Sequence, residues 1–197
     1  MARVDHKKIR QLIAQKQKTV TDRQFFSSRA FAAYFADMAL AQTRRYGYHR
    51  RVKVRTVWEP KNGNTAMTNN ELIWLNAGHP SITQHKSRAE RYAQLCGLFA
   101  HELGHVLYTD FITSQTHLTR LDSGFWYQEP PPLRTSREQH AEEELWDYSG
   151  DSRKHQSMVR FIMHDIMNIL EDGYIEQRMI AEYPGVLGQN LQARRAS

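Results

Sequence analysis

The chain has 197 residues, of which 40% are hydrophobic and 24% charged, a composition typical of one globular domain with or without appendages. Its single cysteine, Cys96, excludes an intrachain disulfide framework and a cysteine-rich zinc ribbon. The net charge of +6 comes from short basic pairs dispersed along the chain, and this dispersion favours a basic solvated surface over a dedicated nucleic-acid face.

The sequence has no apolar signal region at its start, and its longest apolar stretch is too short to span a bilayer. That stretch, residues 30–41, is also interrupted by Asp37. We therefore expect a cytoplasmic protein that does not enter the membrane.

The first 45 residues are expected to be helical, because apolar side chains recur at helical spacing in two places. The two sets are Ile9, Leu12 and Ile13, and then Phe31, Tyr34, Phe35 and Met38. Next, residues 51–58 alternate apolar and basic side chains and predict a strand, and residues 71–78 predict a second one. The connection of about a dozen residues is too long for a tight hairpin.

Residues 88–108 predict a long helix with one apolar face. Ser87 and Glu90 have the spacing of a capping box, which marks the start of a helix. The side chains that follow the spacing of a core face are Tyr92, Leu95, Phe99, Leu103 and Val106.

The segment 112–135, which contains three prolines, predicts a long irregular insertion. A short helix is expected over 138–148, broken at 149–152, and a long one over 156–182 that ends near Pro184. The long helix is expected to be buried, because its apolar stripe consists of Phe161, Ile162, Ile166, Ile169 and Leu170.

These elements predict an α+β fold that is predominantly helical, with a small β-sheet packed on the helix 88–108. The expected organisation is a helical segment over 1–45, one domain over 46–183 with the insertion 112–135, and a frayed polar tail over 184–197.

The pentapeptide HELGH lies inside the helix predicted over 88–108 and carries the strongest chemical signal. His101 and His105 are four residues apart, so both imidazoles project from one face and can reach a single zinc ion. Glu102 is rotated by roughly 100° from His101 and can act as general base on a water in the open coordination position. The alternative is a helix that carries two unrelated histidines.

A catalytic zinc ion needs a third protein ligand. Phe111 occupies the position ten residues after His101, and Asp110 is one residue short, so Asp110 is expected to serve a helix end instead. A second helix can supply a carboxylate, and Glu171 or Asp172 of the long C-terminal helix is the candidate, because a buried carboxylate needs a partner.

Between these two carboxylates we favour Glu171 as the ligand, on one face with Asn168 and His164. Asp172 is the alternative ligand, or an acceptor for the second N–H of a ligand histidine, and Asn168 could contribute in the same way. The competing interpretation is that both carboxylates pair with Arg or Lys of the insertion.

For several other residues the sequence gives only weak evidence of a functional role, and a structural role is the alternative. Tyr174 or His164 could stabilise an oxyanion, although a residue of either type is more often simply packed or exposed. Cys96 is expected in the core. The strand 71–78 could hold an extended peptide at a sheet edge or simply support the core. Five other histidines have no partner spacing and are expected at the surface, namely His79, His85, His117, His140 and His155.

The stretches GLFAHELGHVLYTDF and NILEDGYIE together resemble a zincin-type metallopeptidase domain of bacterial and phage proteins, as does the strand TNNELIWLN. The resemblance covers residues 50–183 and is poor over 112–155. It implies a gluzincin-like site in which His101 and His105 bind zinc, Glu102 is the base, and the acidic pair 171–172 supplies the third ligand.

In that family the domain often precedes a von Willebrand factor type A domain, and its gene often neighbours one for an AAA-type ATPase. The resemblance therefore implies an ATPase or a von Willebrand factor type A protein as a partner. No such domain follows within the sequence, which indicates either a stand-alone version or part of a longer protein.

The sequence thus predicts a zinc-dependent intracellular endopeptidase that binds one zinc ion per chain and acts on a peptide or protein substrate. The alternative is a non-catalytic, zinc-stabilised module that docks on a protein partner. A third interpretation, a basic nucleic-acid binder, is the least favoured.

Overall fold

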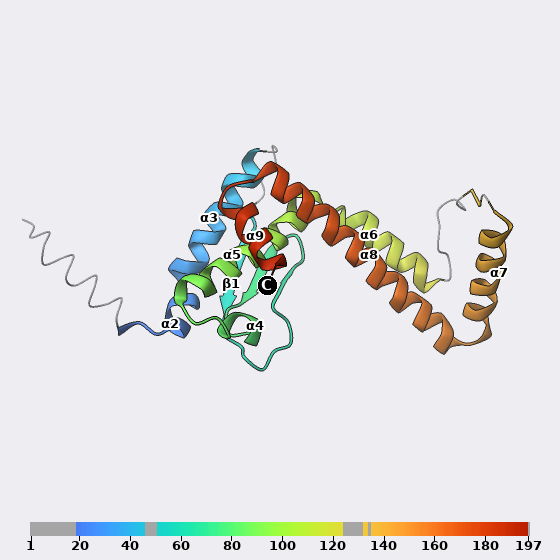
Figure 1. The fold of residues 1–197 in the computed structure, drawn as a ribbon, viewed down its shortest axis with the longest axis horizontal. Coiled ribbons are helices and arrows are strands. Elements are labelled where there is room, and N and C mark those ends of the chain that lie inside the picture. The colour runs from blue at the N-terminus through green and yellow to red at the C-terminus, as the bar shows by residue number, and fades with distance from the viewer. Residues whose placement is uncertain (1–18, 46–50, 124–131, 134, 197) are drawn as a thin grey trace, which may run out of the picture. The chain divides into compact units, whose positions relative to one another are not determined.

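The computed structural model of the chain describes residues 19–45, 51–123, 132–133 and 135–196. Over this range the fold is α+β and predominantly helical, with one three-stranded sheet (Figure 1). Contacts divide the chain into two compact units, Met1–Leu107 with Met179–Ser197, and Tyr108–Arg178. The predicted turns at residues 9–13 lie outside the described residues, and the division expected at residues 45 and 183 stays a prediction.

Helices α2 (Asp22–Phe26) and α3 (Arg29–Arg45) open the first unit and are held by aromatic packing. Phe31 and Phe35 are buried, as the helical stripe predicted, and the ring of Phe35 lies 4.6 Å from that of Phe99 on α5 (Arg88–Tyr108). Tyr34 differs from the prediction because it is exposed, and its hydroxyl lies 2.9 Å from the hydroxyl of Tyr92.

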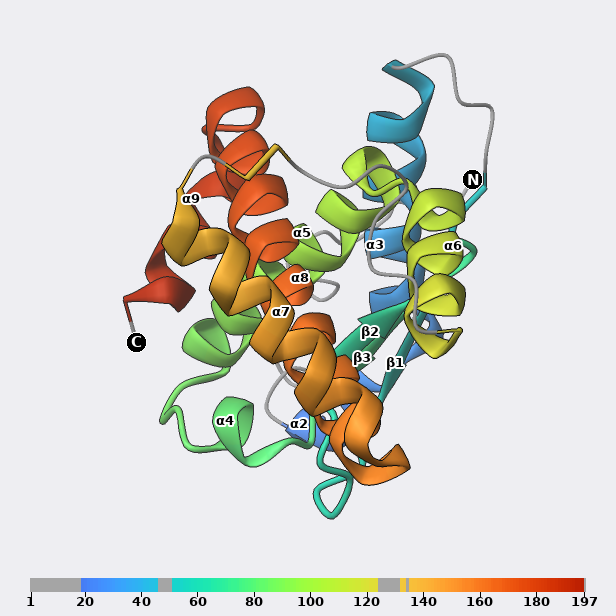
Figure 2. The same ribbon diagram turned by 90° about the vertical axis from the view of Figure 1, so that its right-hand side faces the viewer.

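The sheet consists of β1 (Lys53–Val57), β2 (Ala66–Thr68) and β3 (Leu72–Asn76) in the order β1-β3-β2. β1 runs parallel to β3, and β2 runs antiparallel to it (Figure 2). The two predicted strands are confirmed. The three-residue strand β2 was not predicted, and it forms a hairpin with β3 through a turn in which Asn70 has a φ of 71°. Asparagine tolerates this left-handed conformation better than most residues.

The amide of Asn76 fixes the chain where β3 ends. It is fully buried, and its Oδ1 accepts hydrogen bonds from the backbone N–H groups of Glu59 (2.9 Å) and Gly78 (3.1 Å). Its Nδ2 donates to the carbonyls of Glu59 (2.8 Å) and Asn64 (3.2 Å). The segment that leads into α4 (Pro80–Thr83) and α5 is therefore anchored to the sheet.

Helix α5 begins as its sequence predicts. The backbone N–H of Ser87 donates to the Glu90 carboxylate (3.0 Å), and the N–H of Glu90 donates to the Ser87 hydroxyl (3.1 Å), which is a complete capping box. The first turns are tied to α2, because Asp22 accepts hydrogen bonds from Arg88 and Arg91. From residue 94 onward most of the helix is buried, including the fully buried Leu95, Phe99 and Leu103.

The C-terminal residues are a helix, where a frayed tail was expected. Helix α9 (Val186–Arg195) buries Leu187 and Leu191, and it packs so closely on α5 that an added Cβ at Gly97 would lie 2.7 Å from the carbonyl oxygen of Asn190. The expectation was wrong because two leucines among polar residues are too few to predict a packed helix. Their burial depends on the surface of α5, which the local sequence does not reveal.

The second unit contains α6 (Phe111–Asp122), α7 (Ser136–Asp151) and α8 (Arg153–Glu182), whose last turn, from Met179, belongs to the first unit. The predicted helices over 138–148 and 156–182 are confirmed, with the break at Ser152. Residues 111–122 form a helix instead of the irregular start expected for the insertion. In the part of the chain that the structure describes, no helix has both the length and the apolar character needed to cross a membrane.

The expected burial of α8 is wrong. Helix α6 contacts α8 where Leu118 and Leu121 meet Val159 and Met163. The five side chains of the predicted core stripe are 45–70% exposed, and they are Phe161, Ile162, Ile166, Ile169 and Leu170. Helical spacing identifies an apolar face, but it does not say what covers that face.

Replacing Gly97 with alanine is expected to lower the free energy of unfolding by about 1–3 kcal/mol, because the new methyl group must push α9 away from α5. The matched control is Gly150→Ala in α7, where no atom lies within 4 Å of the added Cβ and the better helix propensity of alanine should be neutral or stabilising. Denaturant titration followed by circular dichroism measures both. Equal stability of the two variants would contradict the close packing of α9.

Candidate metal centre

The centre of the candidate site is the pair of histidines on α5. The rings of His101 and His105 lie 4.9 Å apart between centroids, at 81° to each other, and one ring nitrogen of each lies within 4.8 Å of the other. Two nitrogens bound to one zinc ion at about 2.0–2.1 Å are roughly 3.3 Å apart in a tetrahedral site. Small side-chain rotations would therefore bring both nitrogens onto one ion.

Both histidines are half-buried, whereas Glu102 between them is only 6% exposed. The fully buried Leu103 and the buried Gly104 complete this turn, so the backbone that carries the two rings is held by the core. Glu102 therefore lies on a turn of α5 that packing holds in place, directly after His101 in the sequence.

The acidic pair proposed as the source of the third ligand lies on α8. Glu171 and Asp172 are both half-buried, in contrast to their exposed neighbours Leu170 and Gly173. Consecutive helical residues point about 100° apart, so only one of the two can share a direction with a given neighbour.

Among the described residues, His101, His105 and Asp172 make up the one group of three whose donor atoms could hold a metal ion. The group contains the predicted imidazole pair. It contains Asp172, which the sequence left as the alternative, and it does not contain Glu171. Two imidazole nitrogens and one carboxylate oxygen are donors that zinc accepts, so the residues present fit this metal.

The residues considered for supporting or oxyanion-stabilising roles lie near the acidic pair in the sequence of α8. His164 and Asn168 contact each other, with 3.1 Å between the Asn168 Nδ2 and the His164 Nδ1, and the side chain of Tyr174 is 51% exposed. His164 does not belong to the group that could hold a metal, and a supporting role for Asn168 stays a prediction. An oxyanion role for Tyr174 or His164 stays a prediction.

Asp110 caps a helix, as expected. Its Oδ1 accepts the backbone N–H groups of Ile112 (3.1 Å) and Thr113 (3.0 Å), and its Oδ2 accepts the Thr113 hydroxyl (2.7 Å). These bonds, the Thr113 hydroxyl foremost, lower the pKa of the Asp110 carboxyl. The carboxylate is thus committed to the start of α6.

Cys96 lies in the core, as predicted. It is fully buried, and this burial raises the pKa of its thiol to about 11, while a hydrogen bond with Tyr92 acts in the opposite direction. A neutral thiol is neither a nucleophile nor a good zinc ligand. Five further histidines in the described chain also belong to no group that could hold a metal, namely His79, His85, His117, His140 and His155.

The idea that residues 71–78 hold a peptide at a free sheet edge needs correction. β3 is the central strand, and both of its edges are already paired, one with β1 and the other with β2. Its buried Ile73 and Leu75 instead contribute to the core.

Comparisons of the chain with protein-family models, with curated proteins and with solved structures gave no match. The zincin-type resemblance therefore depends on the two sequence motifs that carry it, HELGH on α5 and the acidic pair on α8.

At pH 8 the Cys96 thiol of the native protein is expected to resist iodoacetamide and to react only after denaturation. The folded state retains the thiol proton up to a pKa of about 11, whereas an unfolded chain releases it near 9. Between these values the folded state binds more protons, so stability should fall as the pH rises through this window. Rapid labelling of the native protein would contradict the assignment of Cys96 to the core.

Proposed function

We propose that the chain is a zinc-dependent endopeptidase whose metal ion is held by His101, His105 and Asp172, with Glu102 as the general base. The observation that carries this proposal is the group of two imidazoles and a carboxylate that could hold a metal, with the buried Glu102 directly beside the first ligand. Glu171 is the alternative source of the carboxylate.

The donor set supports a catalytic site more than a structural one. Structural zinc sites are usually closed by four protein ligands, most often with cysteine among them, whereas catalytic sites have three and leave a fourth position for water or substrate. The group has three members, and Cys96, the only cysteine, is buried in the core. When bound, zinc would act as a Lewis acid on water and on a peptide carbonyl.

In the proposed reaction one side chain of the protein, Glu102, transfers a proton. Glu102 accepts a proton from the attacking water and delivers it to the nitrogen of the departing amine, so the same carboxylate acts first as base and then as acid. His101 and His105 serve as neutral ligands, and the buried turn of α5 orients them. This division of roles requires a carboxylate next to the ligands that does not itself bind the metal.

The metal assignment predicts one zinc ion per chain in the purified, dialysed protein. Inductively coupled plasma mass spectrometry measures this ratio. His101→Ala and His105→Ala should each lose nearly all bound zinc. Asp172→Ala should weaken binding strongly, while the neighbouring Glu171→Ala is the matched control that retains it. The opposite result for the two acidic variants would transfer the third ligand to Glu171. Full zinc content in all four variants would contradict the site.

The role of Glu102 predicts that Glu102→Gln binds zinc like the wild type but hydrolyses a labelled denatured protein about 10²–10⁴-fold more slowly, because the amide cannot accept the proton. Replacing Glu143, an exposed acidic residue of α7, with glutamine is the control and should leave the rate unchanged. An unchanged rate in Glu102→Gln would rule out the proposed base. Zinc binding without hydrolysis by the wild type would favour the zinc-stabilised interaction module.

A further inference from the structure

One face of the sheet carries apolar side chains that remain accessible to solvent. Met67 on β2 lies opposite Trp74 on β3, so the two side chains share a face of the sheet. Leu72, two residues before Trp74, lies on that face as well, whereas the intervening Ile73 and the next residue, Leu75, are fully buried on the other face. Leu72 and Trp74 are half-buried and Met67 is 45% exposed, so a ligand can reach all three.

A cavity of about 350 Å³ opens against Met67, Leu72 and Trp74. We call it the Trp74 pocket. Its volume falls within the range of about 300–1,000 Å³ that is usual for small-ligand sites. None of the residues that line it lies on α5 or α8, so it is a site separate from the candidate metal centre.

The polar part of the Trp74 pocket is built around the carboxylate of Glu59. The backbone of Glu59 is fixed, because its N–H and its carbonyl both bond to the buried amide of Asn76. Its Oε2 accepts a hydrogen bond from the Nδ2 of Asn62 (2.9 Å), and the Oδ1 of Asn62 accepts the backbone N–H of Asn64 (3.0 Å). Neighbouring groups therefore orient the carboxylate before a ligand arrives.

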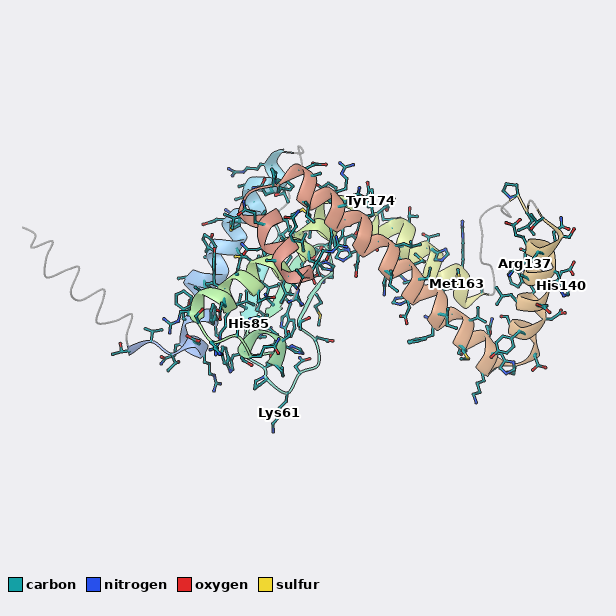
Figure 3. All side chains as sticks on the ribbon, in the orientation of Figure 1. Lys61, His85, Arg137, His140, Met163 and Tyr174 are labelled. Carbon is teal, nitrogen blue, oxygen red and sulfur yellow. The ribbon has the colours of Figure 1, made fainter. Side chains whose placement is uncertain are left out.

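No basic side chain among the described residues neutralises this carboxylate. The Oε1 of Glu59 accepts no hydrogen bond from them, and Glu59 carries the one charge among the described residues that line the pocket. Lys61 is exposed and extends away from the ribbon at the loop between β1 and β2 (Figure 3). Arg55 lies opposite Trp74 on β1, on the other side of β3 from Met67, and does not line the pocket. The pocket thus presents a negative charge in a chain whose net charge is +6.

We propose that the Trp74 pocket binds a guanidinium group on an alkyl stem, the chemistry of an arginine side chain. A guanidinium ion stacks on aromatic faces, and tryptophan is the ring that attracts cations most strongly. One of its N–H groups can donate to the Oε1 of Glu59 while the stem lies along Met67 and Leu72. An anionic ligand would be repelled by Glu59, and a purely apolar ligand would desolvate the carboxylate without offering it a partner.

Nuclear magnetic resonance of the isotope-labelled chain tests the class of ligand. The probes are N-acetylarginine methylamide and its neutral isostere, N-acetylcitrulline methylamide. The readout is the indole N–H signal of Trp74, identified as the signal that is lost in Trp74→Phe. The arginine compound should shift this signal saturably, and the citrulline compound should bind about tenfold more weakly, because it offers no charge-assisted hydrogen bond. Equal binding of the two compounds, or no saturable shift at Trp74, would overturn the proposal.

A pair of acidic variants tests the role of Glu59. Glu59→Gln should raise the Kd for the arginine compound about tenfold and preserve the fold, because the glutamine oxygen can still accept a hydrogen bond from Asn62. Glu71→Gln is the matched control and should leave the Kd unchanged, since it removes an equal charge from an exposed residue of the same hairpin that does not line the pocket. Unchanged binding by Glu59→Gln, or an equal loss in both variants, would contradict the assigned site.

A third probe, propylguanidinium, distinguishes the two sources of this group. It carries the stem and the charge of arginine without peptide groups. Affinity equal to that of the arginine compound supports a small guanidino compound as the ligand. Tighter binding of the arginine compound supports an arginine within a polypeptide.

Discussion

The pitch of the α-helix is the constraint on which the candidate site depends. Because residues four apart share a face, His101 and His105 present their rings 4.9 Å apart, and Glu102 between them is directed elsewhere. The core holds this turn in place, since Leu103 is fully buried and Glu102 nearly so. The rigidity of α5 thus comes from ordinary packing, and the chemistry that we propose depends on three side chains that this packing orients.

Helix α8 combines two features that a single amphipathic pattern cannot explain. It carries the carboxylate that we assign to the metal, and it also carries seven large apolar residues that remain exposed. The half-burial of Asp172 beside the exposed Leu170 shows that the faces of this helix differ in environment.

Most of the local structure could be predicted from the sequence because local signals determine it. The capping box at Ser87, the alternation in β1 and β3, and the long periodic helix α8 are examples. The strand β2 and the helix α9 could not be predicted, since three residues carry little signal and the packing of α9 on α5 depends on the close approach of Asn190 to the distant Gly97. The imidazole pair follows from its spacing, whereas the choice between Glu171 and Asp172 depends on packing between elements far apart in the chain.

The most direct test of the central claim is the zinc X-ray absorption spectrum of the zinc-loaded chain. It should show the multiple scattering of two imidazole rings, with all first-shell atoms being nitrogen or oxygen at about 2.0–2.1 Å. A sulfur ligand at about 2.3 Å, or a first shell without imidazole, would contradict a site built on His101 and His105.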